Sequence, residues 1–197
     1  MTQTTNVIQT FGDFIQQVPS SQEYLTLNFA PSAAARKRRW TNYGLSADFL
    51  GDYFAAFFPG DDLPNSKINQ RDTVKAAVSY VANELLENAV KYNDDSASLP
   101  ISISLHLYEH QIIFHAVNFA NLAIAQKYQA FIEVLLAADL DEFYMTQLEK
   151  TAMGSGGSCM GVLTMMNDYS AKFGWQFQAI ESMPNMVKVD VMAYLDV

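Results

Sequence analysis

Cysteine is almost absent from this chain, and basic residues are few. Cys159 is the single cysteine in 197 residues, which excludes an internal disulfide framework or a cysteine-based metal cluster and fits a reducing compartment. With 12 Lys and Arg against 21 Asp and Glu, the formal net charge is −9, so the chain should repel a nucleic-acid backbone. No segment reaches the roughly 20 apolar residues of a membrane span, and residues 1–6 do not resemble a signal peptide. We expect a cytoplasmic protein that binds neither nucleic acid nor membrane.

The length and the 50% hydrophobic content allow one substantial core, so residues 1–197 are expected to form a single domain. One basic run, 36–39, precedes Trp40. It could be a docking patch for an acidic partner or a phosphate, but a solvated helix face whose aliphatic stems lie over the core is the favoured interpretation.

The most informative segment is the predicted helix from Gln70 to Tyr92. Its apolar residues recur at helical spacing and predict a stripe buried against a sheet, formed by Val74, Val78, Val81, Leu85 and Ala89. Glu84, Asn88 and Lys91 fall within a narrow arc beside this stripe. A carboxylate, an amide and an ammonium at a core edge could act as general base, magnesium ligand and phosphate contact.

Each of these polar residues has a simpler interpretation. Glu87 precedes Lys91 by four positions, so an ordinary helix ion pair could account for the lysine. Glu84 could be a solvated position. Asn88 is harder to explain in this way, because asparagine favours caps and turns over an apolar helix interior.

The remaining elements follow from periodicity and turn residues. Strands are predicted at 24–29, 101–107, 112–119, 175–180 and 186–194, with turns at 109–110 and 183–185. Helices are predicted as a short basic segment after Ser32, then 46–57, 70–92, a tract over 122–150 broken near 138–139, and 160–173 closed by Gly174. Together they predict an α+β two-layer sandwich with helices on one face of a mixed sheet.

Glycines and histidines also suggest ligands. Gly154, Gly156, Gly157 and Gly161 precede and enter a predicted helix, where backbone N–H groups could approach a phosphate, although a flexible connection would have the same composition. Histidines at 106, 110 and 115 invite a metal site, but a turn separates them, so such a site is not favoured.

The run Glu84-Leu85-Leu86-Glu87-Asn88-Ala89-Val90-Lys91-Tyr92 resembles the N-box of the GHKL, or Bergerat-fold, ATPases, and the glycine segment resembles their G2 box. The predicted order of elements is similar to that family over most of the chain. The resemblance implies a fold of the GHKL type that binds ATP with Mg²⁺. It implies that Glu84 is the base, Asn88 the magnesium ligand and Lys91 a phosphate contact, with Gly154, Gly156, Gly157 and Gly161 around the phosphates.

The chain departs from the family after the second strand of its central hairpin. GHKL proteins usually carry Asp-x-Gly-x-Gly there, and this sequence reads Val117-Asn118-Phe119-Ala120-Asn121. Asn118 can offer a carbonyl oxygen to the adenine amino group, whereas Phe119 and Ala120 add side chains where the family has room.

Together, the lone Asn and a helical tract in place of the lid resemble the anti-sigma-factor, SiaB-like branch of serine kinases. That resemblance implies a partner-switching Ser/Thr kinase, often a homodimer, whose partner is a STAS-domain (anti-sigma antagonist) protein. The alternative is a degenerate interaction module that kept the fold and lost the nucleotide. The aromatic segment 53–58 could serve either the core, which is favoured, or an interface.

Overall fold

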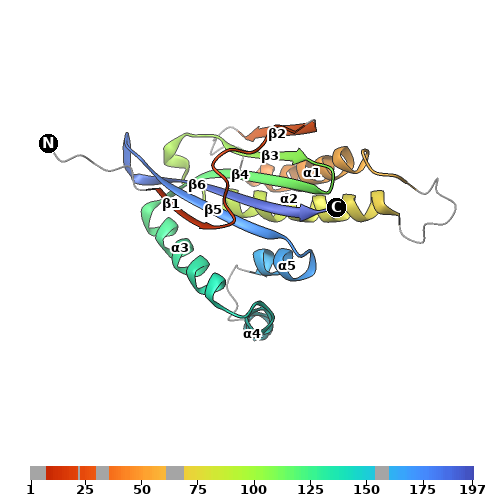
Figure 1. Ribbon diagram of the computed structural model, residues 1–197. Helices are drawn as coiled ribbons and strands as arrows, with labels where there is room; N and C mark the ends of the chain where they lie inside the picture. The colour runs from red at the N-terminus through yellow and green to blue at the C-terminus, as the bar shows by residue number, and fades with distance from the viewer. Residues whose placement is uncertain (1–7, 22, 30–35, 61–68, 154–159) are drawn as a thin grey trace.

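A six-stranded antiparallel sheet forms one layer of the computed structural model, which describes residues 8–21, 23–29, 36–60, 69–153 and 160–197 (Figure 1). The strands are β1 (Ile8–Gly12), β2 (Glu23–Phe29), β3 (Ile101–Leu107), β4 (Gln111–Asn121), β5 (Lys172–Ile180) and β6 (Met183–Asp196). Their order across the sheet is β1-β5-β6-β4-β3-β2. The predicted mixed sheet is therefore wrong, because every neighbouring pair is antiparallel.

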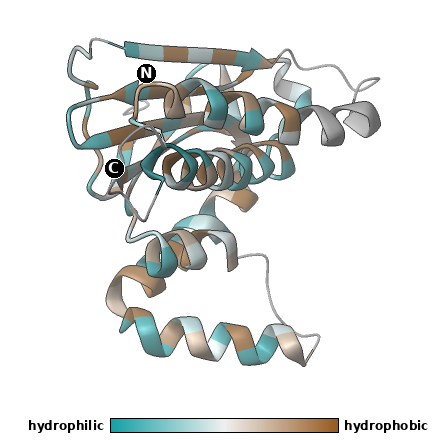
Figure 2. Ribbon diagram, turned by 90° about the vertical axis from the view of Figure 1, so that its right-hand side faces the viewer, coloured by the Kyte–Doolittle hydropathy of each residue, from teal (hydrophilic) through white to brown (hydrophobic). Residues whose placement is uncertain are grey.

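The described residues include five α-helices. They are α1 (Arg36–Ala55), α2 (Gln70–Lys91), α3 (Leu122–Ala137), α4 (Leu140–Ala152) and α5 (Met160–Asp168), with a 3-10 turn, η2 (Asp95–Ala97), after α2. Of these helices, α1, α2, α3 and α5 form the second layer, and α4 packs against α5. Asn69 caps α2 by accepting a hydrogen bond from the Asp72 N–H at 3.2 Å, and Asp139 caps α4 in the same way. The break predicted between α3 and α4 is confirmed. Figure 2 shows α4 far from α1, and α4 buries none of its residues.

One core joins the two layers. All five residues of the predicted stripe on α2 are buried. On the strands, alternate side chains such as Phe114 of β4, Trp175 of β5 and Val189 of β6 pack into the same core, so the helices cover one face of the sheet. The predicted α+β arrangement in two layers is therefore confirmed.

Several predicted boundaries differ from the structure. The two predicted helices before Pro59 are a single helix, α1, and the predicted 160–173 helix ends at Asp168. Gly174 is not a helix cap but lies inside β5, with the backbone of Asp13 and Phe14 so close that a Cβ could not fit. Positive φ at Ser170 turns the chain from α5 into β5.

The last hairpin also turns earlier than predicted. Ile180 pairs with Met183, so the turn consists of residues 181–182, and residues 183–185 belong to β6. A register irregularity beside Ile180 accommodates the two strands there.

Strand β1 was not predicted from the sequence. It pairs with β5 at one edge of the sheet, and residues 13–21 then cross the face opposite the helices to reach β2 at the other edge (Figure 1). The crossing segment is tied down by the Asp13 N–H donating to the Phe173 carbonyl at 2.8 Å and by the hydroxyl groups of Tyr194 and Tyr108.

Candidate functional site

The C-terminal end of α2 is fixed over the end of β4 by a pair of hydrogen bonds. The Phe119 N–H donates to Asn93 Oδ1 at 3.0 Å, and the Asp94 N–H donates to the Phe119 carbonyl at 2.6 Å. The side chain of Asn93 therefore extends the sheet's hydrogen bonding to the segment just after the helix. This anchor sets the distance between the polar face of α2 and the inward side chains of β4.

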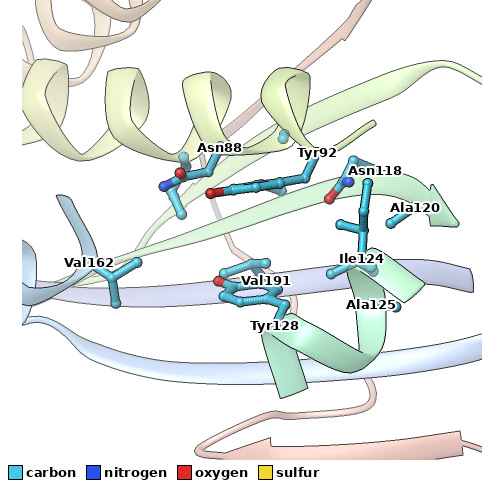
Figure 3. Close-up of a pocket in the computed structure, with 13 residues that line it drawn as sticks. Asn88, Tyr92, Asn118, Ala120, Ile124, Ala125, Tyr128, Val162 and Val191 are labelled. Carbon is cyan, nitrogen blue, oxygen red and sulfur yellow. The ribbon is translucent and has the colours of Figure 1, made fainter. Parts of the chain in front are cut away.

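A cavity lies between α2, the sheet, α3 and the start of α5 (Figure 3). Asn88 from α2 and Asn118 from β4 both line it, as does Val162 from α5. Asn118 is only 5% exposed. Neither amide side chain has a hydrogen-bond partner among the residues that the structure describes. Asn88 is partly buried, and a buried amide such as that of Asn118 is costly without a partner, so the two amides on one cavity indicate a place for a polar ligand.

Glu84 connects α2 to the glycine-containing end of α5. Its carboxylate lies directly over Gly161, where a Cβ atom would contact the carboxylate oxygen and the carboxyl carbon. Burial, with a smaller contribution from the charge of Glu87, raises the pKa of the Glu84 carboxyl. No cation pairs with it in the described part of the chain. A raised pKa in a carboxyl beside a cavity is typical of general bases and of ligand-binding groups.

Lys91 lies at the mouth of the cavity rather than in a helix ion pair. Glu87, its expected partner, accepts a hydrogen bond from Asn83 at 2.9 Å, and the Lys91 ammonium lies 5.4 Å from the centre of the Tyr92 ring. Lys91 and Lys127 of α3 line an outer groove of about 470 Å³ that also includes Asn88. Two ammonium groups make this groove locally positive in a protein with a formal net charge of −9.

Two tyrosine rings narrow the passage from the outer groove to the inner cavity. Tyr92, directly after α2, and Tyr128 of α3 are nearly parallel, at 18°, with ring centres 6.3 Å apart, and they face each other in Figure 3. Trp175 holds Tyr128 by donating its indole N–H to the tyrosine hydroxyl at 2.9 Å. The inner cavity itself has a free volume of about 20 Å³, enough for a single water molecule.

The structure brings together most of the residues expected to form a site. Asn88 and Asn118 line the cavity and Lys91 lines the outer groove, while Glu84 and Gly161 contact each other beside the lining residues Leu85 and Val162. Gly154, Gly156 and Gly157 fall outside the described residues. The expected crowding by Phe119 does not occur at the cavity, because alternation along β4 puts Asn118 and Ala120 toward it and Phe119 opposite.

Sequence reasoning missed the contributions of α3 and of Tyr92, the residue that follows α2. Tyr92 could have been found, since it lies one helical turn after Asn88. Tyr128, Ile124 and Lys127 gave no signal, because only the packing of α3 brings them to the cavity.

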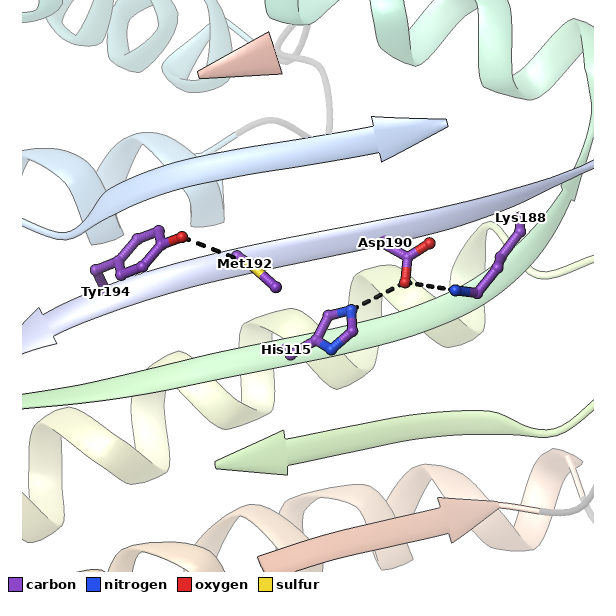
Figure 4. Close-up of polar contacts among 5 residues, drawn as sticks. All are labelled: His115, Lys188, Asp190, Met192 and Tyr194. Atoms are coloured by element: carbon purple, nitrogen blue, oxygen red, sulfur yellow. Dashed lines mark hydrogen bonds and ion pairs between the residues drawn. The ribbon is translucent and has the colours of Figure 1, made fainter. Parts of the chain in front are cut away.

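The three histidines do not share a site. His106 stacks on Tyr24 and bonds to Ser21 at 3.2 Å, and His110 lies beside Glu109 at the surface. His115 Nε2 lies 2.9 Å from Asp190 Oδ1, which also accepts from Lys188 Nζ at 2.8 Å, on the sheet face away from the helices (Figure 4). No group of three metal-binding side chains of the His, Cys, Asp and Glu types occurs in the described residues.

Comparison with known proteins adds no family. No model of a known protein family matches the chain, and no curated protein matches its sequence. Within the described residues, no helix combines the length and the apolar character that crossing a bilayer requires.

Proposed function

We propose that this protein is an ATP-binding regulatory Ser/Thr kinase of the partner-switching type, with a STAS-type protein as its substrate. The observation that carries the proposal is the placement of the Asn88 and Asn118 amides on one cavity, without a hydrogen-bond partner in the part of the chain that the structure describes. The Glu84 carboxylate lies close by, against Gly161. A structural core has no use for these groups, whereas a nucleotide with its metal ion supplies a partner for each.

Each residue takes the part that its chemistry allows. Asn118 receives the base from the floor of the cavity, and Lys91 and Lys127 attract the phosphates at the mouth. Asn88 offers the single side-chain oxygen that suits a magnesium ion held mainly by phosphates and water. That ion, when bound, neutralises charge on the transferring phosphoryl group.

Glu84 is the general base of the proposed reaction. Its carboxylate takes the proton of the partner's hydroxyl as that oxygen forms a bond to the γ-phosphorus and the bond to the β-phosphate oxygen breaks, giving a phosphoester and ADP. The raised pKa of this carboxyl brings its basicity closer to the working pH of a general base.

A non-catalytic interaction module is the second candidate, and the size of the inner cavity favours it. A free volume of about 20 Å³ does not hold a purine. For a base to reach Asn118, Tyr128 and Ile124 of α3 have to move outward. If they do not, the GHKL-like arrangement serves as a scaffold.

Thermal unfolding with and without ATP and MgCl₂ separates the two candidates. A ligand that binds the folded state raises the melting temperature, by an amount set by its concentration relative to its Kd. We expect a rise at millimolar ATP that Asn88→Ala makes independent of magnesium. No shift at millimolar nucleotide contradicts the kinase proposal and leaves the interaction module.

Incubation with labelled ATP and candidate STAS-domain proteins then tests the chemistry. Glu84→Ala should keep the ATP-induced shift and lower phosphoryl transfer by about 10²- to 10⁴-fold, the usual contribution of a general base. Glu133→Ala, which removes an exposed carboxylate from α3, is the matched control and should retain transfer. If phosphoryl transfer survives in Glu84→Ala, the general base is a different residue.

A further inference from the structure

The gap between the rings of Tyr92 and Tyr128 is close to the width of one planar ring. The two rings lie within 18° of parallel, with centres 6.3 Å apart, and they face each other in Figure 3. A planar ring that stacks on both needs about 3.5 Å on each side, so the gap has to widen by less than about 1 Å to hold it. Helix α3 carries Tyr128, and the outward movement of α3 that a base needs in order to reach Asn118 widens the same gap.

The two ends of this slot differ in chemistry. On the outer side, Lys91 and Lys127 line the apolar groove that opens to solvent. On the inner side, the amide of Asn118 lines the small cavity behind the rings. A flat ligand in the slot therefore has ammonium groups near one end and a hydrogen-bonding amide near the other, which suits a nucleoside polyphosphate.

The slot and the lysines do not select one base over another. Stacking on tyrosine is tolerant, because every base has a π-face, and the phosphates are common to all nucleoside triphosphates. Asn88 and Asn118 are the amide side chains that line the inner cavity in the described residues, and Asn88 is assigned to the magnesium ion. Selection of the base therefore depends on Asn118.

The Asn118 amide is able to match either purine. A carboxamide carries one acceptor oxygen and one donor nitrogen. The side chain is 5% exposed, and within the described residues no hydrogen bond fixes which way its amide points. In one orientation the oxygen accepts from the adenine amino group while the nitrogen donates to the adjacent ring nitrogen. After the amide turns over, its nitrogen donates to the guanine carbonyl and its oxygen accepts from the adjacent guanine N–H.

We infer that this site accepts GTP as well as ATP, with either purine stacked between Tyr92 and Tyr128 and matched by the Asn118 amide. The inference rests on the proposed function, because it requires a nucleoside triphosphate at this cavity. It adds the substrate class, which is purine nucleoside triphosphates without selection between adenine and guanine.

Isothermal titration calorimetry of the full chain with ATP and with GTP, each with MgCl₂, tests the inference. The two Kd values should agree within about tenfold, and inorganic tripolyphosphate, which has the charge but no base, should bind at least about tenfold more weakly. Binding of ATP with GTP more than about 100-fold weaker overturns the inference and leaves the proposed function intact. Equal binding of tripolyphosphate and ATP also overturns it, and absence of binding by both nucleotides overturns the proposed function as well.

Replacing one ring at a time tests the slot. Tyr92→Leu and Tyr128→Leu should each weaken ATP and GTP by the same factor, about 5- to 150-fold, the loss expected for one base–aromatic stack. Tyr128→Phe keeps the ring and should keep the affinity. The matched control is Tyr24→Leu, which removes a ring that is 61% exposed on β2 and should leave both Kd values unchanged. Wild-type affinity in Tyr128→Leu overturns stacking in the slot.

Trp175 provides a spectroscopic signal from the slot that does not depend on phosphoryl transfer. Its indole N–H donates to the Tyr128 hydroxyl at 2.9 Å, so displacement of Tyr128 by a base changes the surroundings of the indole. Trp40→Phe removes the other tryptophan of the chain. In that variant ATP and GTP should each change the emission of Trp175, whereas tripolyphosphate should not. Unchanged emission at saturating nucleotide means that the base binds elsewhere and overturns the inference.

Discussion

The two faces of the sheet hold their buried polar groups in different ways. On the face away from the helices, Asp190 is 2% exposed, and its Oδ1 accepts from His115 and Lys188 (Figure 4). On the helix face, Asn118, Asn88 and Glu84 have no such partners in the described residues. The charged partners of Asp190 Oδ1 distinguish the two faces, although Asp190 Oδ2 and the neighbouring Gln176 Nε2 are buried without a hydrogen-bond partner in the described residues. On the helix face Asn118 is buried, whereas Asn88 and Glu84 are partly buried.

The pKa values of the Asp190 and Glu84 carboxyl groups are shifted in opposite directions on the two faces. Burial by itself raises the pKa of the Asp190 carboxyl, but the hydrogen bonds and charges of His115 and Lys188 outweigh burial and hold the pKa below its ordinary value. For Glu84, burial and the charge of Glu87 act together and raise the pKa. The Asp190 carboxylate therefore stabilises the folded state at neutral pH. The Glu84 carboxylate destabilises it, as expected for a group retained for binding or catalysis.

Removing Asp190 should have the largest effect on stability. Asp190→Ala leaves Lys188 and His115 without their acceptor and should lower the free energy of unfolding by about 3 kcal/mol, or roughly 6–12 °C in melting temperature. Because the pKa of Asp190 is depressed in the folded state, its contribution is present above the unfolded pKa of about 3.9 and is lost as the pH falls further. Denaturant titrations should therefore show a smaller difference in the free energy of unfolding between the wild type and Asp190→Ala at pH 3 than at pH 7.

The control for this variant is Asp196→Ala, which removes an exposed carboxylate from the same strand, one that accepts from Gln111. Asp196→Ala should lower the free energy of unfolding by less than about 1 kcal/mol. Equal losses for the two variants would show that the buried cluster is no more important than a surface contact.

The contact between Glu84 and Gly161 should give the next largest effect. Gly161→Ala places a methyl group against the Glu84 carboxylate and should lower the free energy of unfolding by about 1–2 kcal/mol, despite the better helix propensity of alanine. In a Glu84→Ala background the same change should be neutral or stabilising. A double-mutant cycle by chemical denaturation measures the coupling, and additive values would mean that the two segments do not touch in solution.

Replacing the Asn118 amide should change the free energy of unfolding in the opposite direction to the loss of Asp190. Asn118→Leu removes a buried polar group that has no partner among the described residues, so the free energy of unfolding should rise by about 1 kcal/mol while any ATP-induced shift disappears. Calorimetry with and without ATP and MgCl₂ measures both quantities. A destabilised variant would indicate that Asn118 has a structural partner.

The smallest effect is expected for Glu84→Gln. The raised pKa means that the charged carboxyl is disfavoured in the folded protein, and this penalty is complete above the folded pKa and absent below the unfolded value of about 4.3. The variant should therefore be more stable than the wild type at pH 7, by less than about 1 kcal/mol, and equal to it near pH 3.5. Urea titrations at the two pH values check this, and a gain that persists at the lower pH would have a cause other than charge.

Local periodicity determined much of this molecule. The stripe on α2 and the alternation along β3 predicted those elements with the correct buried faces, because burial of one side imposes a period of 3.6 or 2 on the sequence. For β4 the sequence predicted the strand but not which side chains face the cavity. The sequence also identified Asn88 as a residue that local propensity does not explain, and the resemblance to the GHKL family singled out Glu84 and Asn118.

Tertiary structure decided what those residues face. The contact of Glu84 with Gly161, the position of Tyr128 against Tyr92 and the burial of Asp190 between His115 and Lys188 all join residues distant in sequence. The same holds for β1 and for the crossing segment that makes Gly174 a close backbone contact rather than a helix cap. Such pairings depend on how whole elements pack, and no periodicity within one element records which partner another element will bring.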